Sequence, residues 1–237
     1  MKQLATHEGD TYLPNVLPNS PANYIFIGME PSLGRWAGND GSKAEEMLSA
    51  GFRNFHWSMD DFVFHYSIER FLLKPGEIYH ITDVSKGAMM VQSASIDRTN
   101  RYADWFPLLI DELKLLASAN AIYFSVGRAV IECLKQLDFP FPLYQVLHFS
   151  SQASLSRKRV IQGRENEFES FRRTISANDI LATARDRLAR SGMSSTLKEK
   201  ILARLSRSGP LSESRKMLAF TYKTQFDRVL LRGEMPI

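Results

Sequence analysis

Residues 24–34 read Tyr-Ile-Phe-Ile-Gly-Met-Glu-Pro-Ser-Leu-Gly. The apolar run from Tyr24 to Ile27 favours a buried strand, which stops at Gly28. A carboxylate, a proline and a second glycine follow, so the strand is predicted to end in a tight loop. In α/β proteins such loops at the carboxyl ends of strands hold ligands. Glu30 is therefore a candidate site residue at the lip of a pocket; the alternative is a glycine-proline turn with a surface glutamate.

Composition sets the class of protein. The chain has 237 residues, of which 44% are hydrophobic, and this suits one large domain or a domain with an appendage. It contains no apolar run near the ~18 residues of a membrane span and no secretory signal pattern. We therefore expect a cytoplasmic protein with no membrane partner. Cys133 is the only cysteine in the sequence, which excludes an internal disulfide.

Charge is distributed unevenly along the chain. Residues 1–148 carry 12 basic and 17 acidic side chains, whereas residues 149–237 carry 18 and 9. This asymmetry suggests a polyanion-binding segment attached to a more acidic core. Solvated faces of basic helices are the alternative.

Strand and helix patterns alternate through the first two thirds of the chain. Four strands are predicted at residues 23–28, 78–84, 121–126 and 143–147, with helices at 60–73, 104–117 and 128–137. This order predicts an α/β fold, a three-layer sandwich with a mostly parallel four-stranded sheet.

The two ends of the chain differ from this pattern. Residues 1–21 are predicted to be an irregular lead-in. From about residue 165 the pattern is helical, and Thr196 and Glu199 form a predicted capping box. We therefore divide the chain into a core, residues 1–163, and a basic helical C-terminal extension, residues 164–237.

Three polar residues stand at or just beyond predicted strand ends: Glu30, Asp83 and His148. If these ends lie on one side of the sheet, a carboxylate can face an imidazole, which is a usual arrangement for acid/base or electrostatic chemistry. A lone histidine after a strand is more often a surface or structural residue. Spacing alone leaves both interpretations open.

Two short motifs resemble those of the uracil-DNA glycosylase superfamily. The first is Gly28-Met29-Glu30-Pro31, where that superfamily has glycine, a variable residue, Asp or Asn, and proline. The second begins at His148 and is similar to the superfamily's His-Pro-Ser segment. The first motif is most similar to the Gly-Met-Asn-Pro form of the single-strand-selective monofunctional branch. The resemblance covers roughly residues 22–160.

The resemblance implies two catalytic residues. Glu30 takes the position of the Asp or Asn that orients or activates the water attacking the deoxyribose anomeric carbon. His148 corresponds to the histidine that stabilises negative charge on the pyrimidine O2 as the base leaves, which requires a preorganised donor. The target base must first be flipped out of the stack.

DNA-binding residues are implied in the same way. Ser150 and Ser151 would bind backbone phosphate, and Leu155 would fill the space left by the extruded base. Arg157, Lys158 and Arg159 follow this wedge and could neutralise phosphates. In the extension, the candidate phosphate contacts are Arg172, Arg173, Arg187 and Arg190.

The base pocket is expected to include Gly28, Met29, Ser32, Asp83 and the aromatic Phe55. Ser32 stands where the uracil-specific branch has a tyrosine that blocks substituents at pyrimidine C5. Asp83 stands where many members have an asparagine, and a carboxylate suits an exocyclic amino group such as cytosine N4. A structural capping role for Asp83 is an equal alternative. Phe149 replaces the proline of the second motif, which loosens that part of the resemblance.

The resemblance therefore implies a monofunctional DNA glycosylase that excises a uracil-like or 5-modified pyrimidine and leaves an abasic site. We expect no metal and no cofactor, and no lysine lies in the motifs to form a Schiff base. Repair fits, and so does antiphage defence by attack on modified cytosine in foreign DNA. The rival functions are a noncatalytic nucleic-acid-binding protein and a small-nucleoside hydrolase. Base identity, strand preference and oligomeric state are left open.

Overall fold

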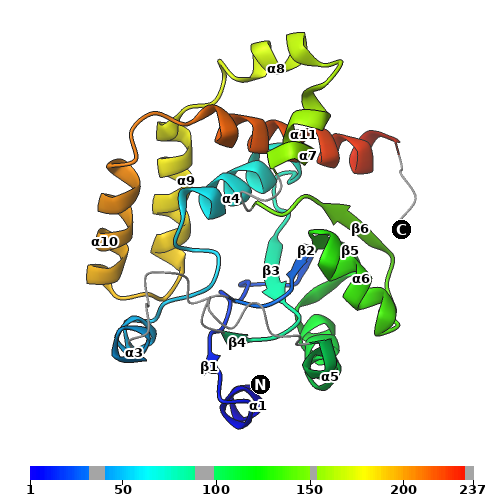
Figure 1. Ribbon diagram of the computed structural model, residues 1–237, viewed down its shortest axis with the longest axis vertical. Helices are drawn as coiled ribbons and strands as arrows, with labels where there is room; N and C mark the ends of the chain where they lie inside the picture. Colours follow the sequence, from blue (N-terminus) through cyan, green and yellow to red (C-terminus); the bar gives the residue numbers. More distant parts are fainter. Residues whose placement is uncertain (32–40, 89–98, 150–153, 233–237) are drawn as a thin grey trace. The chain divides into compact units, whose positions relative to one another are not determined.

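A computed structural model describes residues 1–31, 41–88, 99–149 and 154–232. The fold is mixed α/β around a four-stranded parallel sheet flanked by helices, so the predicted class is confirmed (Figure 1). The strand order is β3-β2-β5-β6. The bounds are β2 (Ala22–Gly28), β3 (Tyr79–Asp83), β5 (Ala117–Val126) and β6 (Leu143–Val146). Among the helices that the structure describes, none combines the length and apolarity that a membrane crossing requires.

The parallel register of β2 and β3 fixes the edge that carries the first motif. Gly28 lies opposite Asp83 at the carboxyl ends of the two strands. The backbone bonds continue beyond the sheet, since Val84 N donates to the Gly28 carbonyl (2.9 Å) and Ser85 N to the Met29 carbonyl (3.0 Å). The loops after β2 and β3 are therefore tied together.

Alternating strand residues build the core of the sheet. Ile25 and Ile27 belong to a buried apolar cluster with residues of α5 (Thr99–Leu116) and α6 (Arg128–Gln136), among them Leu109 and Leu134. The intervening Phe26 stacks on Phe124 of β5, with ring centroids 4.8 Å apart. Apolar side chains thus cover both faces of β2, as is usual for a central strand of a parallel sheet.

The N-terminal lead-in contains regular structure that the sequence did not predict. It forms α1 (Lys2–His7) and β1 (Thr11–Tyr12), and β1 pairs antiparallel with β4 (Gly87–Ala88). This pairing joins residues about 75 positions apart, so no local pattern reveals it. A further short helix is α3 (Gly41–Ser49).

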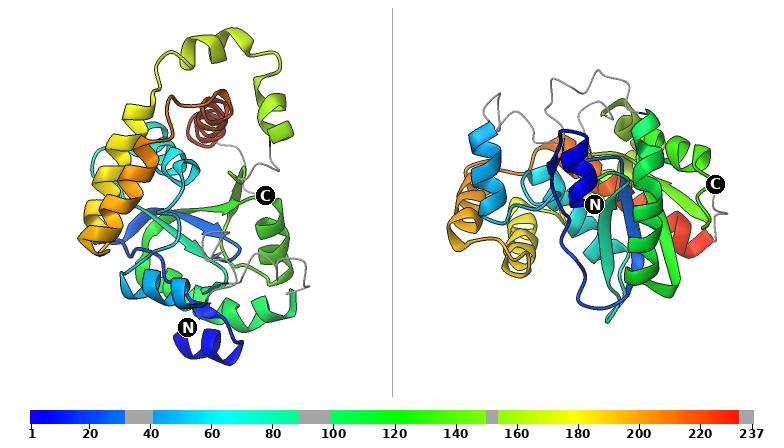
Figure 2. Two further views of the ribbon diagram at one scale, coloured as in Figure 1. Left: turned by 60° about the vertical axis from the view of Figure 1, so that its left-hand side comes forward. Right: turned by 90° about the horizontal axis from the view of Figure 1, so that it is seen from below.

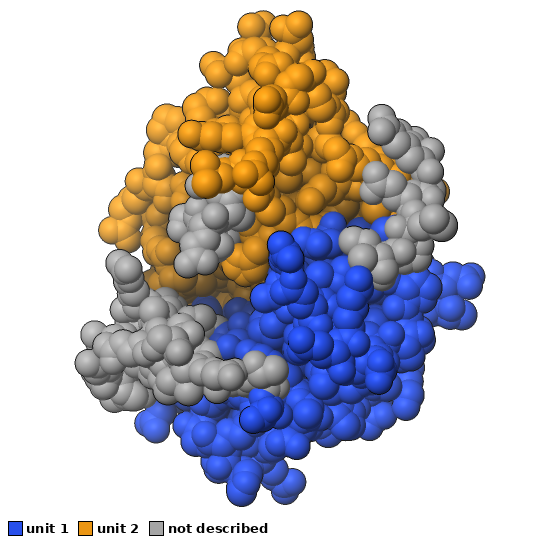
Figure 3. Space-filling model, turned by 45° about the vertical axis from the view of Figure 1, so that its right-hand side comes forward, with its two compact units in different colours: residues 1–54, 76–145, 237 blue, residues 55–75, 146–236 orange. Residues whose placement is uncertain are grey.

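The described chain forms two compact units, coloured in Figure 3. The first contains residues 1–54 and 76–145, and the second contains 55–75 and 146–236. The helices of the second unit are α4 (Met59–Phe71), α7 (Ser154–Ile161), α8 (Glu165–Phe171), α9 (Ala177–Arg190), α10 (Ser195–Ser206) and α11 (Glu213–Arg232).

The C-terminal helices pack around a helix from the middle of the chain. Both α9 and α11 contact α4, and α10 packs beside α9 as an antiparallel hairpin (Figure 2). The predicted helical extension therefore shares its core with residues 55–75. Ser194 caps α10 by accepting a bond from Leu197 N, so the capping box predicted at Thr196 is wrong. Ser194 has the extended backbone that an N-cap requires.

A buried polar network ties α5 to β3. Glu112 Oε1 accepts bonds from His80 Nε2 (3.0 Å) and Thr82 Oγ1 (2.8 Å). Glu112 Oε2 lies 2.9 Å from Lys86 Nζ, and both side chains are less than a tenth exposed. Burial alone would raise the pKa of Glu112, but the Lys86 charge and the His80 bond outweigh it and lower that pKa to about 2.

Replacing Glu112 with Gln tests this network. The change leaves the buried Lys86 ammonium without its counter-charge, so we expect urea unfolding at neutral pH to show a loss of about 3 to 5 kcal/mol. Glu132→Gln is the matched control, because Glu132 pairs with Arg128 on the exposed surface of α6. It should change the free energy of unfolding by less than about 1 kcal/mol. Equal losses would contradict the network's importance.

The same pair of proteins gives a pH prediction. A folded-state pKa lowered from 4.5 to about 2 stabilises the protein fully above the ordinary value and loses that stabilisation as the pH falls. The stability difference between wild type and Glu112→Gln should therefore shrink from about pH 5 to about pH 2. A difference that stays constant across this window would show that Glu112 ionisation is not what stabilises the fold.

Candidate functional site

Glu30 lies in the loop after β2, two residues beyond Gly28. Its side chain is 14% exposed, and Oε2 is 3.6 Å from Nη1 of Arg101 on α5. The Met29 carbonyl bond to Ser85 anchors the backbone just before it. The sequence placed Glu30 at this edge, but it did not predict the arginine beside it.

Arg101 is the hub of an ion-pair cluster. Its Nη2 donates to Glu8 Oε2 (2.5 Å) and to Ser85 Oγ (3.0 Å), and its Nη1 lies 2.6 Å from Asp10 Oδ2. Trp105, one turn further along α5, donates from Nε1 to Glu8 (2.9 Å). These partners fix the guanidinium from several sides, so Glu30 meets a cation of defined orientation.

Metal binding requires several ligands that converge on one point. Among the residues that the structure describes, no group of three or more His, Cys, Asp or Glu side chains is arranged to hold a metal ion. In the cluster around Glu30, the guanidinium of Arg101 is the cation that the carboxylates share.

Asp83 is buried at the end of β3, opposite Gly28. Its Oδ2 accepts bonds from Asn15 Nδ2 (3.0 Å) and Asn54 Nδ2 (2.8 Å). Burial raises its pKa, with Lys86 and the two amides acting in the opposite direction. This geometry favours the structural role that the sequence left open, because Asp83 ties two distant segments to the strand end. Base reading by Asp83 stays a prediction.

Three predicted site residues lie outside the described parts of the chain. They are Ser32, Ser150 and Ser151. Gly28 and Met29 lie where the first motif requires them, at the end of β2 and in the loop that follows. Their contribution to a base pocket stays a prediction.

His148 belongs to the second unit and follows β6 by two residues. Its imidazole stacks on the ring of Phe149, with centroids 4.6 Å apart and planes at 18°. The Phe149 ring packs in turn against Phe55 (5.9 Å) and Phe64 (6.2 Å). The phenylalanine that replaces the motif proline therefore supplies a platform for the histidine.

The surroundings of His148 set its protonation state. The residue is exposed, yet the protein atoms around its ring remove enough water to lower its pKa below 6.5, and the Arg157 charge lowers it further. The imidazole is therefore neutral at neutral pH. A neutral imidazole carries one N–H donor and one acceptor nitrogen.

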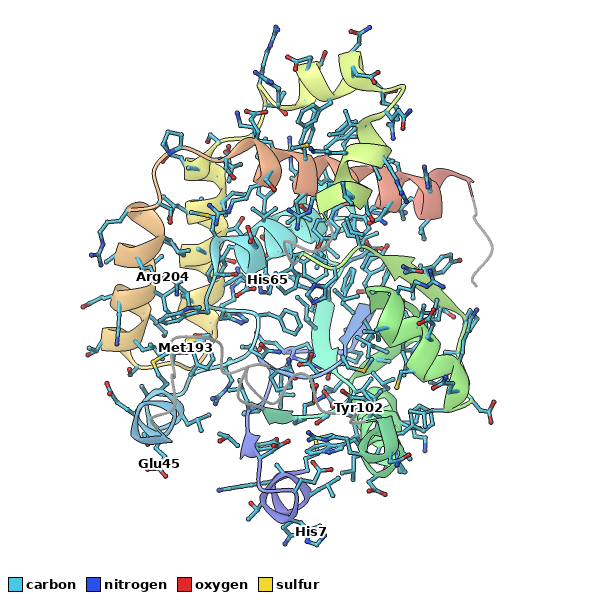
Figure 4. All side chains as sticks on the ribbon, in the orientation of Figure 1. His7, Glu45, His65, Tyr102, Met193 and Arg204 are labelled. Atoms are coloured by element: carbon cyan, nitrogen blue, oxygen red, sulfur yellow. The ribbon has the colours of Figure 1, made fainter. Side chains whose placement is uncertain are left out.

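Phe55 has an unusual backbone conformation next to this cluster. Its φ is 60°, in the left-handed region that bulky residues rarely adopt. The buried His65 lies on α4 (Figure 4), and the carbonyl of Phe55 accepts a bond from its Nε2 (2.9 Å). Burial, with His56 and Arg187 nearby, lowers the pKa of His65 well below 6.5, so His65 is a neutral donor. The Phe55 ring is buried and packs on Phe149, while its stacking on a base stays a prediction.

Helix α7 carries the predicted DNA-contacting residues. Leu155 is 67% exposed, which is unusual for a large apolar side chain, and Lys158 and Arg159 are also exposed. Arg157 is only 4% exposed and donates to Ser214 Oγ (3.0 Å) and to the Phe149 carbonyl (2.5 Å). Arg157 is therefore an interior residue and not the surface cation that the sequence predicted.

The sequence missed several residues that contact the candidate site. Arg101 and Trp105 had a detectable signal, because their spacing places them on one face of α5. Tyr222 and Gln225 of α11 bond to the backbone of Leu147. Tyr222 and Gln225 had no detectable signal in the sequence, since more than 70 positions separate them from Leu147.

The absence of a side chain at Gly87 leaves room for the ion-pair cluster of Arg101. A Cβ added there would collide with Arg101 Nη2 and lie 2.8 Å from Asp10 Oδ2. We expect Gly87→Ala to cost about 1 to 3 kcal/mol in thermal or urea unfolding, because it forces the ion-paired side chains apart.

A double-mutant cycle checks the cause of this loss. In an Arg101→Ala background, the collision with the guanidinium is gone, so Gly87→Ala should cost clearly less than in wild type. Additive losses would show that the glycine matters for another reason.

No protein-family model matches the chain, and no curated protein sequence matches it.

Proposed function

We propose that the protein is a monofunctional DNA glycosylase. It hydrolyses the N-glycosidic bond of a flipped-out uracil-like or 5-modified pyrimidine and leaves an abasic site. The observation that carries the proposal is His148: a neutral, stacked imidazole stands at the second motif of a chain whose first motif places Glu30 at the carboxyl edge of a parallel sheet. The other support is the order and context of the two motifs.

The proposed reaction divides the chemistry between two residues. Glu30 accepts the proton of the water that attacks the anomeric carbon, or its charge stabilises the cationic sugar as the glycosidic bond breaks. The bonding electrons leave with the base, and negative charge develops on the pyrimidine O2. His148 donates a hydrogen bond from its N–H to that oxygen. Because the imidazole is neutral, it stabilises the negative charge through this hydrogen bond without transferring its proton. The base finally takes its proton from solvent.

Exposed residues of α7 suit the extrusion step. Leu155 presents an apolar side chain to solvent, as a wedge that replaces a flipped base would. Lys158 and Arg159 are exposed on the same helix, where they would contact phosphates.

Of the predicted phosphate contacts in the extension, Arg173 and Arg190 are exposed, and Arg172 and Arg187 are partly exposed. Arg172 pairs with Glu169 and Glu213, Arg187 with Glu69, and Arg190 with Asp186. Helix α10 carries a row of cations at helical spacing beside its buried side: Lys200, Arg204 and Arg207. Arg204 lies over the Trp57 ring, 4.3 Å from its centroid, so we assign phosphate binding to Lys200 and Arg207.

The substrate class follows from Ser32 and Asp83. Ser32 would leave room for a substituent at pyrimidine C5, which supports a modified base. Asp83 gives less support to a cytosine amino group than the sequence suggested, because Asn15 and Asn54 already hold its carboxylate. A 5-substituted pyrimidine of foreign DNA, attacked in the cytoplasm, is the substrate class that we favour.

A panel of oligonucleotides tests the activity. The strands contain uracil, 5-hydroxymethyluracil, 5-hydroxymethylcytosine or glucosylated 5-hydroxymethylcytosine, and abasic sites are revealed by alkali cleavage. We expect cleavage at one modified base with wild type and its loss with Glu30→Gln and with His148→Ala. The matched controls Glu132→Gln and His7→Ala change an exposed glutamate and an exposed histidine elsewhere and should cleave normally.

The possible outcomes separate the rival functions. Salt-sensitive DNA binding without cleavage of any strand would favour a noncatalytic binding protein. Release of base from free nucleosides, but not from DNA, would favour a small-nucleoside hydrolase. Either result would overturn the glycosylase proposal for these substrates.

The α10 row has its own test. The affinity for a short DNA duplex is measured as a function of salt concentration for wild type and a Lys200→Ala/Arg207→Ala variant. Loss of two phosphate contacts should reduce the slope of log affinity against log salt by about 2. Arg128→Ala, which removes an exposed arginine from α6, should leave the slope unchanged. An unchanged slope in the double variant would remove α10 from the DNA-binding surface.

A further inference from the structure

We propose that Tyr222, Gln225 and Arg157 are positioning residues that hold His148 in its working orientation. The proposal assigns the last helix of the chain to the site, in addition to the DNA contacts expected of the extension. It rests on the proposed function for the catalytic role of His148. Its test uses a readout that does not depend on activity.

Two side chains of α11 hold the backbone before His148. Gln225 Oε1 accepts a bond from Leu147 N (3.1 Å), and the Tyr222 hydroxyl donates to the Leu147 carbonyl (3.0 Å). That carbonyl belongs to the peptide that joins Leu147 to His148. Beyond the end of β6 these backbone groups need other partners, and α11 provides them. Tyr222 is fully buried, and burial raises its pKa, so the hydroxyl keeps its proton.

Arg157 holds the backbone after His148. Its Nη2 donates to the Phe149 carbonyl, and its Nη1 donates to Ser214 Oγ in the first turn of α11. Peptide groups on both sides of the histidine are thus fixed by side chains that are themselves buried or bonded. Such support limits the orientations that the imidazole can take.

The ring of Phe149 completes the arrangement. His148 stacks on it, and Phe64 of α4 packs against it and also against Tyr222, whose ring centroid is 4.9 Å from that of Phe64. The residue that donates to the backbone therefore also supports the aromatic platform. A change at Tyr222 should therefore affect the imidazole through the bond to the Leu147 backbone and through the aromatic platform.

Arg157 links orientation to protonation. Burial lowers the pKa of His148, and the Arg157 charge lowers it further; from α11, the titratable Tyr222 bonds to this segment. From α4, Asp60 and Asp61 act on Tyr222. Asp60 pairs with Arg215 (2.7 Å), and Asp61 belongs to the capping box of α4. Removing the Arg157 charge should therefore raise the pKa of His148.

Nuclear magnetic resonance of the full-length protein with ¹⁵N-labelled histidine tests the proposal. The imidazole shifts of His148, assigned with His148→Ala, are followed against pH in four variants. Arg157→Gln removes the charge, Arg157→Lys keeps it but loses the forked contact, and Tyr222→Phe removes one hydroxyl. Tyr66→Phe is the matched control, since it removes a hydroxyl from α4, where the Tyr66 ring packs on Phe71.

We expect the pKa of His148 to rise in Arg157→Gln and to stay low in Arg157→Lys. Tyr222→Phe should shift or broaden the imidazole resonances, whereas Tyr66→Phe should leave them as in wild type. Gln225→Met repeats the Tyr222 test from the other side of Leu147, in case one variant folds poorly. An imidazole whose pKa and shifts are the same in all these variants would overturn the proposal.

Activity supplies a second readout once a substrate is known. A displaced donor weakens transition-state stabilisation more than substrate binding, so Tyr222→Phe should lower kcat by roughly 10- to 100-fold with little change in KM. The resonance changes without any glycosylase activity would sustain the positioning role and overturn only the proposed function. Normal kcat in Tyr222→Phe would contradict the positioning role.

Discussion

The parallel pairing of β2 with β3 is the constraint on which the surroundings of Glu30 depend. It places Gly28 opposite Asp83, and the bonds that continue past the strand ends bring Ser85 to the Met29 carbonyl. Ser85 also accepts from Arg101, whose guanidinium stands beside Glu30. The Lys86 and Glu112 pair fixes α5, and so the helix that carries Arg101, against β3. The position of the Glu30 carboxylate thus depends on the sheet register, a buried ion pair and one arginine.

In the second unit, different interactions orient His148. His148 is held by an aromatic platform and by bonds to its neighbouring peptides, and its surroundings favour the neutral ring. In the proposed reaction, the Glu30 carboxylate would act on water or the sugar and the neutral imidazole of His148 on the departing base. The different roles proposed for Glu30 and His148 follow from the different groups that surround them.

The sequence predicted the sheet well because its strands are short apolar runs bounded by turn residues, and strand 23–28 differs from β2 by one residue at its start. It placed Glu30 correctly for the same reason. It missed the pairing of β1 with β4, because the partners are distant in sequence. It also misplaced Arg157, whose neighbours Lys158 and Arg159 are exposed. Burial of one member of a basic run depends on Ser214 and Phe149, which no local pattern connects to it.

The most informative measurement asks whether the protein releases a free base from DNA. DNA rich in modified pyrimidines is incubated with wild type or Glu30→Gln, and the small molecules in solution are analysed by mass spectrometry. The account predicts that a free pyrimidine base appears with wild type alone, while the DNA strands stay intact. Release of nucleosides or nucleotides in place of bases, or equal release by both proteins, would contradict it.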